Sequence, residues 1–169
     1  MNTLQISKRI YELTNRRRLD NNLPPLINDN ILNNSALLHS EYMRKYEFFS
    51  HENHTNRLLF SPKKRIQYCG GSYIYYGENI AMFPIYKSTR QHFLEILTTR
   101  IKIYQGNDCL NVNEFANEVV KGWMESPGHR RNILNVHYNQ LGIGTLLTNK
   151  NIKGHNVVYG IITKNFGGY

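Results

Sequence analysis

The chain has 169 residues, the size of one ordinary globular domain, and 40% of them are hydrophobic, which is enough for a core. Its formal net charge of +9 favours anionic lipid, polyanionic glycans or nucleic acid as partners, although a soluble basic protein needs no such partner. The basic clusters, such as those at 16–18 and 63–65, are short and scattered. They lie in no nucleic-acid-binding motif, so no specific nucleic-acid binding is expected.

An amphipathic helix is predicted over residues 4–19. Apolar side chains recur there at helical spacing, and the aliphatic stem of one arginine extends the same face. The residues of that face are Ile6, Ile10, Leu13 and Arg17. The Pro24-Pro25 pair ends this helical segment.

A second helix is predicted over about 30–46, with Asn28 or Asp29 as its N-cap. His39 falls on the apolar face of this helix, in register with Leu32 and Met43. A histidine in that position is expected to be packed in the core and not to be a metal ligand.

The middle of the chain is predicted to be irregular over residues 47–72, with a helical turn near 56–60. The run "GGSYIYYGEN" then predicts a turn, a short extended aromatic segment and a second turn at Gly77. Apolar residues at helical spacing predict a further helix over Gln91–Tyr104.

Asn111 and Glu114 have the spacing of a capping box, and we expect the helix that they open to run to about Met124. The side chains expected to be buried on it are Phe115, Val119, Val120 and Trp123. Ser126 and Pro127 then suit the N-cap and the first position of a next helix.

Two strands are predicted at the C-terminal end, over Gln140–Thr148 and Asn156–Phe166, joined by a hairpin loop at 149–153. Glycines at 142 and 144 indicate that another backbone approaches the first strand closely. The second strand is apolar on both faces, which is typical of a central strand. Helices first and antiparallel strands mostly last predict one α+β domain over residues 1–169.

Three side chains are candidates for chemistry. His51 lies in "FFSHENH", where the H-E-x-H spacing is not the H-E-x-x-H of zinc proteases. Glu78 is flanked by aromatic and apolar residues, and a semi-buried carboxylate needs a partner such as a histidine. His129 is expected in the first turn of a helix, where the positive helix end favours a neutral imidazole that can bind a metal or accept a proton. It could equally hydrogen-bond a neighbour.

The chain has two cysteines, Cys69 and Cys109. Their spacing matches neither a zinc knuckle nor a redox dithiol. They could form one disulfide or remain two thiols. No apolar run is long enough to span a membrane, and residues 1–20 do not have the pattern of a signal peptide.

Six segments, in order along nearly the whole chain, resemble the CAP superfamily (cysteine-rich secretory proteins, antigen 5 and pathogenesis-related 1, with an SCP-like domain), and its bacterial branch in particular. They are "NRRRLDNNLPPLINDNIL", "SALLHSEYMRKYEFFSH", "GENIA", "VVKGWMESPGHRRNIL", "YNQLGIGTLL" and "VVYGIITKNFG". The resemblance implies a three-layer α-β-α sandwich with a small antiparallel sheet between helices.

The family's cleft often carries two histidines and two glutamates, and some members bind zinc or another divalent metal there. By position, the resemblance implies that His51 and His129 are the histidines and Glu78 the first glutamate. Ser126 stands where animal members have the second glutamate, and Glu125, one residue earlier, is the available substitute. Asn79, which follows Glu78, and Ser126 are further residues expected at the cleft.

The resemblance implies an extracellular or cell-surface protein, with a leader or lipid anchor outside this sequence. A non-enzymatic, monomeric binding module for a host factor, a lipid or a sterol is the expected function. The alternative is a zinc-dependent, protease-like hydrolase with His51 and His129 on the metal and Glu78 as general base. Two histidines are few for this chemistry, since catalytic zinc usually has three protein ligands. The trio could also be structural, tying loops to the core.

Overall fold

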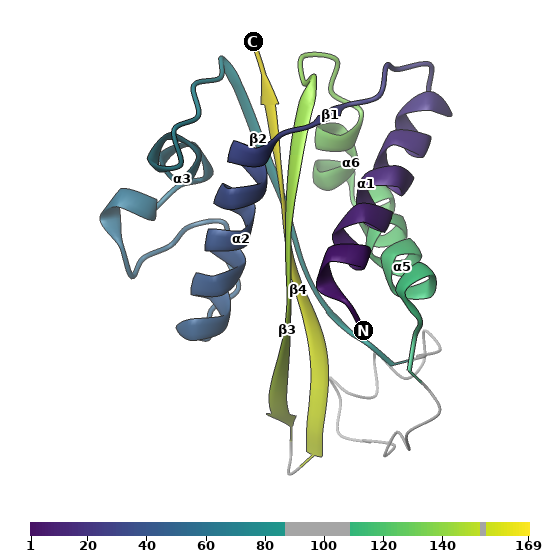
Figure 1. The fold of residues 1–169 in the computed structure, drawn as a ribbon, viewed down its shortest axis with the longest axis vertical. Helices are drawn as coiled ribbons and strands as arrows, with labels where there is room; N and C mark the ends of the chain where they lie inside the picture. Colours follow the sequence, from purple (N-terminus) through teal and green to yellow (C-terminus); the bar gives the residue numbers. More distant parts are fainter. Residues whose placement is uncertain (87–108, 153–154) are drawn as a thin grey trace.

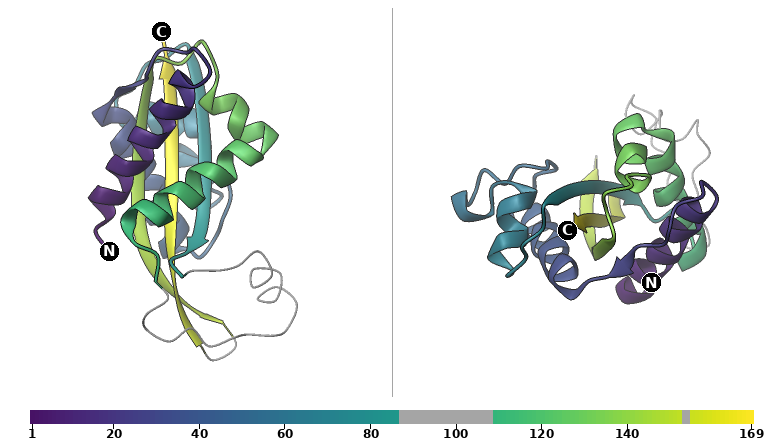
Figure 2. Two further views of the ribbon diagram at one scale, coloured as in Figure 1. Left: turned by 90° about the vertical axis from the view of Figure 1, so that its right-hand side faces the viewer. Right: turned by 90° about the horizontal axis from the view of Figure 1, so that it is seen from above.

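The computed structural model describes residues 1–86, 109–152 and 155–169 and shows a sheet between two layers of helices (Figure 1). α2 and α3 cover one face of the sheet, and α1, α5 and α6 cover the other, as the view from above confirms (Figure 2). The elements are α1 (Thr3–Leu19), β1 (Ile27–Asn28), α2 (Asn30–Lys45), η1 (Arg57–Leu59), α3 (Pro62–Tyr68), β2 (Tyr75–Pro84), α5 (Val112–Glu125), α6 (Pro127–Ile133), β3 (Gln140–Ile152) and β4 (His155–Gly168). The expected α+β, three-layer α-β-α sandwich is confirmed.

The four strands lie in the order β1-β3-β4-β2. β4 is central, as predicted, and pairs antiparallel with both β3 and β2, whereas β1 pairs parallel with β3 through two residues. Both predicted C-terminal strands are present and longer than expected. The predicted loop at 149–153 is wrong over 149–152, because those residues continue the ladder with β4. The polar side chains at 149–151 do not interrupt backbone pairing in a hairpin.

α1 begins at the expected place, with the Asn2 side chain accepting the Leu4 N–H at 2.9 Å. The prediction that Arg17 extends its apolar face is wrong, because Arg17 is exposed and Arg18 is buried instead. The Arg18 guanidinium donates to the carbonyls of Ile133 at 2.9 Å and Asn135 at 2.8 Å. Those bonds hold the α6–β3 connection against α1, and a sequence pattern does not reveal them.

The segment predicted as irregular contains the expected helical turn, η1, and also a helix that the prediction missed, α3. Ser61 caps α3 and Pro62 is its first residue, the same arrangement that marks α6. Gly77 is not a turn but lies within β2, where a Cβ atom would collide with the ring of Tyr138. The helix predicted over Gln91–Tyr104 lies outside the described residues.

The main core lies between the sheet and the α1/α5 layer. The capping box of Asn111 and Glu114 is confirmed, and the four α5 side chains predicted to be buried all pack in this core. Gly142 and Gly144 in β3 face α2, where a Cβ atom on either would collide with the helix backbone, so the predicted close approach is confirmed.

His39 is fully buried, as expected of a packed residue. Cys69 is half-buried and Cys109 is exposed, and neither forms a disulfide within the described parts of the chain. Over the same residues, no helix combines the length and the apolar character that crossing a membrane requires.

Candidate functional site

The Glu78 carboxylate is the centre of a buried polar network on the α2/α3 side of the sheet. Its side chain is 1% exposed, and both oxygens accept hydrogen bonds. His51 Nδ1 donates to Oε1 at 2.9 Å, and Arg65 Nη2 donates to Oε2 at 2.7 Å. The amide of Asn165, oriented with its nitrogen toward Glu78, donates to Oε2 at 3.1 Å. Both oxygens of the carboxylate are therefore engaged by donors.

These donors hold Glu78 ionised. Burial raises the pKa of this carboxyl, but the hydrogen bond from His51 and the positive charge of Arg65 outweigh burial and leave the pKa below its ordinary value. A buried carboxylate paired in this way is a fixed negative charge at neutral pH.

Arg65 ties the loop around His51 to the sheet. It is fully buried in α3, and its guanidinium also donates to the carbonyls of Leu59 at 2.9 Å, Phe60 at 3.1 Å and His51 at 3.0 Å. Sequence analysis missed this residue, because it considered Arg65 only as part of the short basic cluster at 63–65. The Ser61-Pro62 start of a helix was the available signal, since it places Arg65 in the helix's first turns.

His51 lies at the rim of the network, with its side chain 47% exposed. Because Nδ1 donates to Glu78, Nε2 is the ring's acceptor nitrogen, and within the described residues it has no hydrogen-bond partner. A carboxylate that fixes one imidazole nitrogen while the other stays available is the outer-shell arrangement of many metal-binding histidines.

His39 is a second histidine near Glu78. Its side chain is fully buried, and its Nε2 is 3.9 Å from Glu78 Oε1. Nε2 is 2.9 Å from the Ser50 carbonyl, which identifies it as the protonated nitrogen. Burial is the largest influence on this ring and lowers its pKa from 6.5 to about 4, although the Glu78 charge acts in the opposite direction. His39 is thus a neutral part of the network's packing.

His129 occupies the first turn of α6, as predicted, and is half-buried. Burial lowers its pKa, and the nearby charges of His51 and Lys164 lower it further, so the ring is neutral. The fully buried Asn79 fixes its backbone by donating to the His129 carbonyl at 3.1 Å. Asn132 adds a second link from α6, to Glu78 O at 3.1 Å and Asn79 Oδ1 at 2.8 Å.

The two remaining residues expected at the cleft do not join this network. Glu125 is exposed at the end of α5 and has no ion pair or hydrogen bond of its side chain among the described residues. Ser126 has the backbone conformation of an N-cap but donates and accepts no side-chain cap bond. The structure therefore brings His51 and Glu78 into direct contact, with His129 on the adjoining helix.

Metal-ligating residues are few around this network. Across 1–86, 109–152 and 155–169, no group of three or more His, Cys, Asp or Glu side chains is arranged to hold a metal ion. Glu78 is committed to Arg65 and His51, so His51 Nε2 and His129 are the remaining donors. This set does not fit a catalytic zinc centre with three protein ligands.

The sequence profile of the cysteine-rich secretory protein family, CAP, matches residues 11–161. The chain belongs to this family. A curated CAP-related sequence, the uncharacterised protein YkwD of Bacillus subtilis strain 168, is 32% identical over 137 residues, which are 81% of this chain. The chain spans 41% of that relative's length.

Solved structures share the CAP fold over 99% of this chain. An extracellular SCP-domain protein from Bacillus anthracis has a TM-score of 0.66 at 26% identity, with 41% of its own chain covered. An outer surface protein from Borrelia burgdorferi has a TM-score of 0.67 at 19% identity, with 96% covered. These comparisons place the chain in the bacterial branch of the superfamily.

Proposed function

We propose that this CAP chain is an extracellular or cell-surface binding module that catalyses no reaction. The observation that carries the proposal is that His51, Arg65 and Asn165 donate to both oxygens of the Glu78 carboxylate, whose side chain is 1% exposed. A general base needs a free oxygen directed at its substrate and a pKa near the working pH. Glu78 has neither, since its oxygens are occupied and its pKa is lowered.

The network suits a structural role better. Arg65 and Glu78 connect the 50–60 loop to β2, and Asn79 and Asn132 connect β2 to α6. Holding loops in fixed positions on both sides of a sheet is what a recognition surface requires. The partner is a host factor, a lipid or a sterol, and the net charge of +9 favours an anionic surface on it.

The proposed location is supported by the neighbours, which are described as extracellular in Bacillus anthracis and as outer-surface in Borrelia burgdorferi. We extend that location to this chain, which would act as a monomer formed by one domain over residues 1–169.

A divalent metal on His51 and His129 is a second candidate role for the cleft. It is favoured by the fixed His51 ring, whose Nε2 is available, and by the lowered pKa of His129. His51 and His129 are the two residues that would hold such an ion, one protein ligand fewer than catalytic zinc usually has. Such a site would serve the alternative, hydrolytic function only with a base other than Glu78.

The test combines calorimetric zinc titration with hydrolysis of casein and of p-nitrophenyl esters. The variants are His51→Ala and His129→Ala, and the matched control is His54→Ala, because His54 is 72% exposed and contacts Glu52 outside the network. We expect no turnover in any of these proteins. Turnover that is lost in both cleft variants and kept in His54→Ala would overturn the proposal. Zinc binding with the same variant pattern would establish the metal site without catalysis.

Ligand uptake is measured separately, with a fluorescent sterol and a fluorescent fatty acid. Saturable binding supports the lipid branch of the proposal, and its absence at micromolar protein leaves a protein or glycan partner.

A further inference from the structure

The two edges of the sheet are treated differently by the fold. On the β2 edge, alternate carbonyls accept bonds from side chains of other elements. Tyr138 OH donates to Tyr76 O at 2.7 Å, Asn132 Nδ2 donates to Glu78 O at 3.1 Å, and Trp123 Nε1 donates to Ile80 O at 3.1 Å. This edge is covered, which is how natural sheets avoid unwanted strand pairing.

Among the described residues, the β3 edge is covered only at its start. β1 pairs with Gln140 and Leu141, and the Asn33 side chain then accepts the Ile143 N–H at 2.8 Å. In an antiparallel ladder alternate residues point both backbone groups away from the partner strand. Since the backbone N–H of Ile143 points away from β4, the backbone N–H and C=O groups of Thr145 and Leu147 also point away from it. Within the described residues, the backbone groups of these two have no hydrogen-bond partner.

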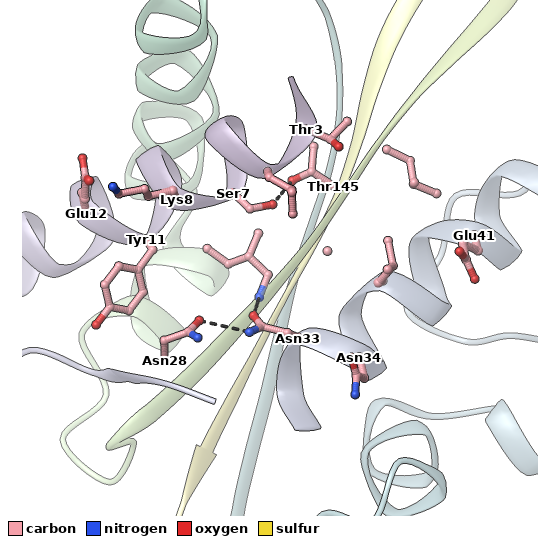
Figure 3. A pocket seen from close by; sticks show the side chains of 15 residues that line it. Thr3, Ser7, Lys8, Tyr11, Glu12, Asn28, Asn33, Asn34, Glu41 and Thr145 are labelled. Atoms are coloured by element: carbon pink, nitrogen blue, oxygen red, sulfur yellow. Dashed lines mark hydrogen bonds between the residues drawn. The ribbon is translucent and has the colours of Figure 1, made fainter. Parts of the chain in front are cut away.

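Of these two residues, Thr145 lines a groove between α1 and α2. Its volume is about 720 Å³, within the range of ordinary ligand sites, and its floor is formed by 143–146 of β3. Figure 3 shows Ser7 and Lys8 on the α1 side, Asn34 and Glu41 on the α2 side, and Asn33 at the end nearest β1. Ser7 Oγ donates to Thr145 Oγ1 at 2.8 Å, so α1 is held beside the edge, and Thr145 is 4% exposed.

We propose that this groove binds an extended peptide segment of a second protein, which adds to β3 as a further strand. Unpaired N–H and C=O groups that repeat every second residue along a strand are matched by the backbone of another extended chain. The guest strand continues the line that β1 begins, since β1 already pairs with the same edge and leaves it after two residues. The groove shares no lining residue with the network of His51, Glu78 and His129.

The walls of the groove indicate which peptides fit. Successive side chains of an added strand would point alternately to α1 and to α2. The α1 wall carries Lys8 and also Glu12, whose carboxylate is paired with Arg9, and the α2 wall carries Glu41. Lys8 and Glu41 form no ion pair in the described chain. The favoured peptide therefore has acidic residues at the positions facing α1 and basic residues at those facing α2.

The first experiment selects binders from a phage-displayed library of random linear peptides on the full chain. Binding of the selected peptides is then compared in Thr145→Pro and Thr145→Val. The proline removes the outward N–H and places a ring in the groove without breaking the ladder to β4. The valine keeps the N–H and removes the hydroxyl that Ser7 bonds.

We expect Thr145→Pro to weaken binding roughly tenfold or more, and Thr145→Val to bind like the parent chain. No enrichment of any peptide, or peptides that bind Thr145→Pro unchanged, would overturn the proposal.

A second measurement uses the parent chain alone and does not depend on the variants folding. Peptides methylated at one backbone nitrogen at a time should lose binding at every second position. Amide hydrogen exchange at Thr145 and Leu147 should be fast in the free chain and slow in the complex. Binding lost without this two-residue alternation, or slow exchange in the free chain, would contradict strand addition. His51→Ala should leave peptide binding unchanged, so this inference and the proposed cleft function fail separately.

Discussion

Lys164 Nζ lies 4.1 Å from the centroid of the Trp123 indole ring, in the core between the sheet and α5. The lysine is fully buried, and its ammonium or amine group donates to Thr14 Oγ1 at 3.0 Å. Burial lowers the pKa of this amine well below its usual range. No carboxylate forms an ion pair with it among the residues that the structure describes. The face of the Trp123 ring and the Thr14 hydroxyl therefore contact the amino group where a carboxylate counter-ion would be expected.

We predict that Lys164→Met raises the free energy of unfolding at pH 7 by about 1–3 kcal/mol, because a buried amine is replaced by an apolar chain of similar length. In the unfolded chain this lysine is protonated below about pH 10.4, whereas burial in the folded chain disfavours its protonated form. The cost is thus present at neutral pH and disappears as the pH rises toward that value. Urea titrations at pH 7 and pH 10 measure the difference, which should shrink at pH 10. Lower stability of the variant at pH 7 would show that the cation–ring contact dominates.

Arg65→Ala is expected to lower the free energy of unfolding by about 3–5 kcal/mol, since it leaves the buried Glu78 carboxylate short of its cationic partner. The matched control is Arg9→Ala, which breaks an exposed pair with Glu12 and should cost less than about 1 kcal/mol. Urea unfolding of both variants measures the two effects. A loss in Arg65→Ala as small as in Arg9→Ala would mean that the network is not structural.

Acid should destabilise the chain partly through His39. Its pKa is 6.5 when unfolded and about 4 when folded, so between these values the unfolded chain binds more protons. Stability therefore falls as the pH drops from about 6.5 to about 4, by up to about 3 kcal/mol for this group. His39→Gln keeps a donor for the Ser50 carbonyl and removes the titration. Its thermal midpoint should vary less with pH across this window than that of the parent chain, and parallel curves would refute the assignment.

Gly144→Ala should destabilise the chain, because the added Cβ would collide with the α2 backbone at Ala36 and Leu37. A loss of about 1–3 kcal/mol is expected from such overpacking. Gly122→Ala is the matched control, since it adds the same methyl group to an exposed position of α5 with no atom nearby. It should stabilise by about 0.5–1 kcal/mol through helix propensity. Thermal unfolding of both variants is the measurement, and we expect the midpoint to fall in Gly144→Ala and to rise in Gly122→Ala. A rise in both variants would contradict the close approach of α2 to Gly144.

The sequence alone determined the features that depend on local chemistry and periodicity. Asn111 and Glu114 mark a helix start because their side chains bond the backbone within one turn. The glycines at 142 and 144 indicate a close approach because only a missing Cβ allows it. The pairing of His51 with Glu78 followed from the family resemblance and from the need of a buried carboxylate for a partner.

Tertiary structure alone decided which charged residues are buried. Arg17 and Arg18 are adjacent and chemically identical, and the carbonyls of Pro24 and of the α6–β3 connection select Arg18. Arg65 and Asn165 reach Glu78 from a helix and a strand far apart in the chain, which no local pattern encodes. The same holds for the unpaired edge of β3, because an open strand edge is defined by the elements that do not cover it.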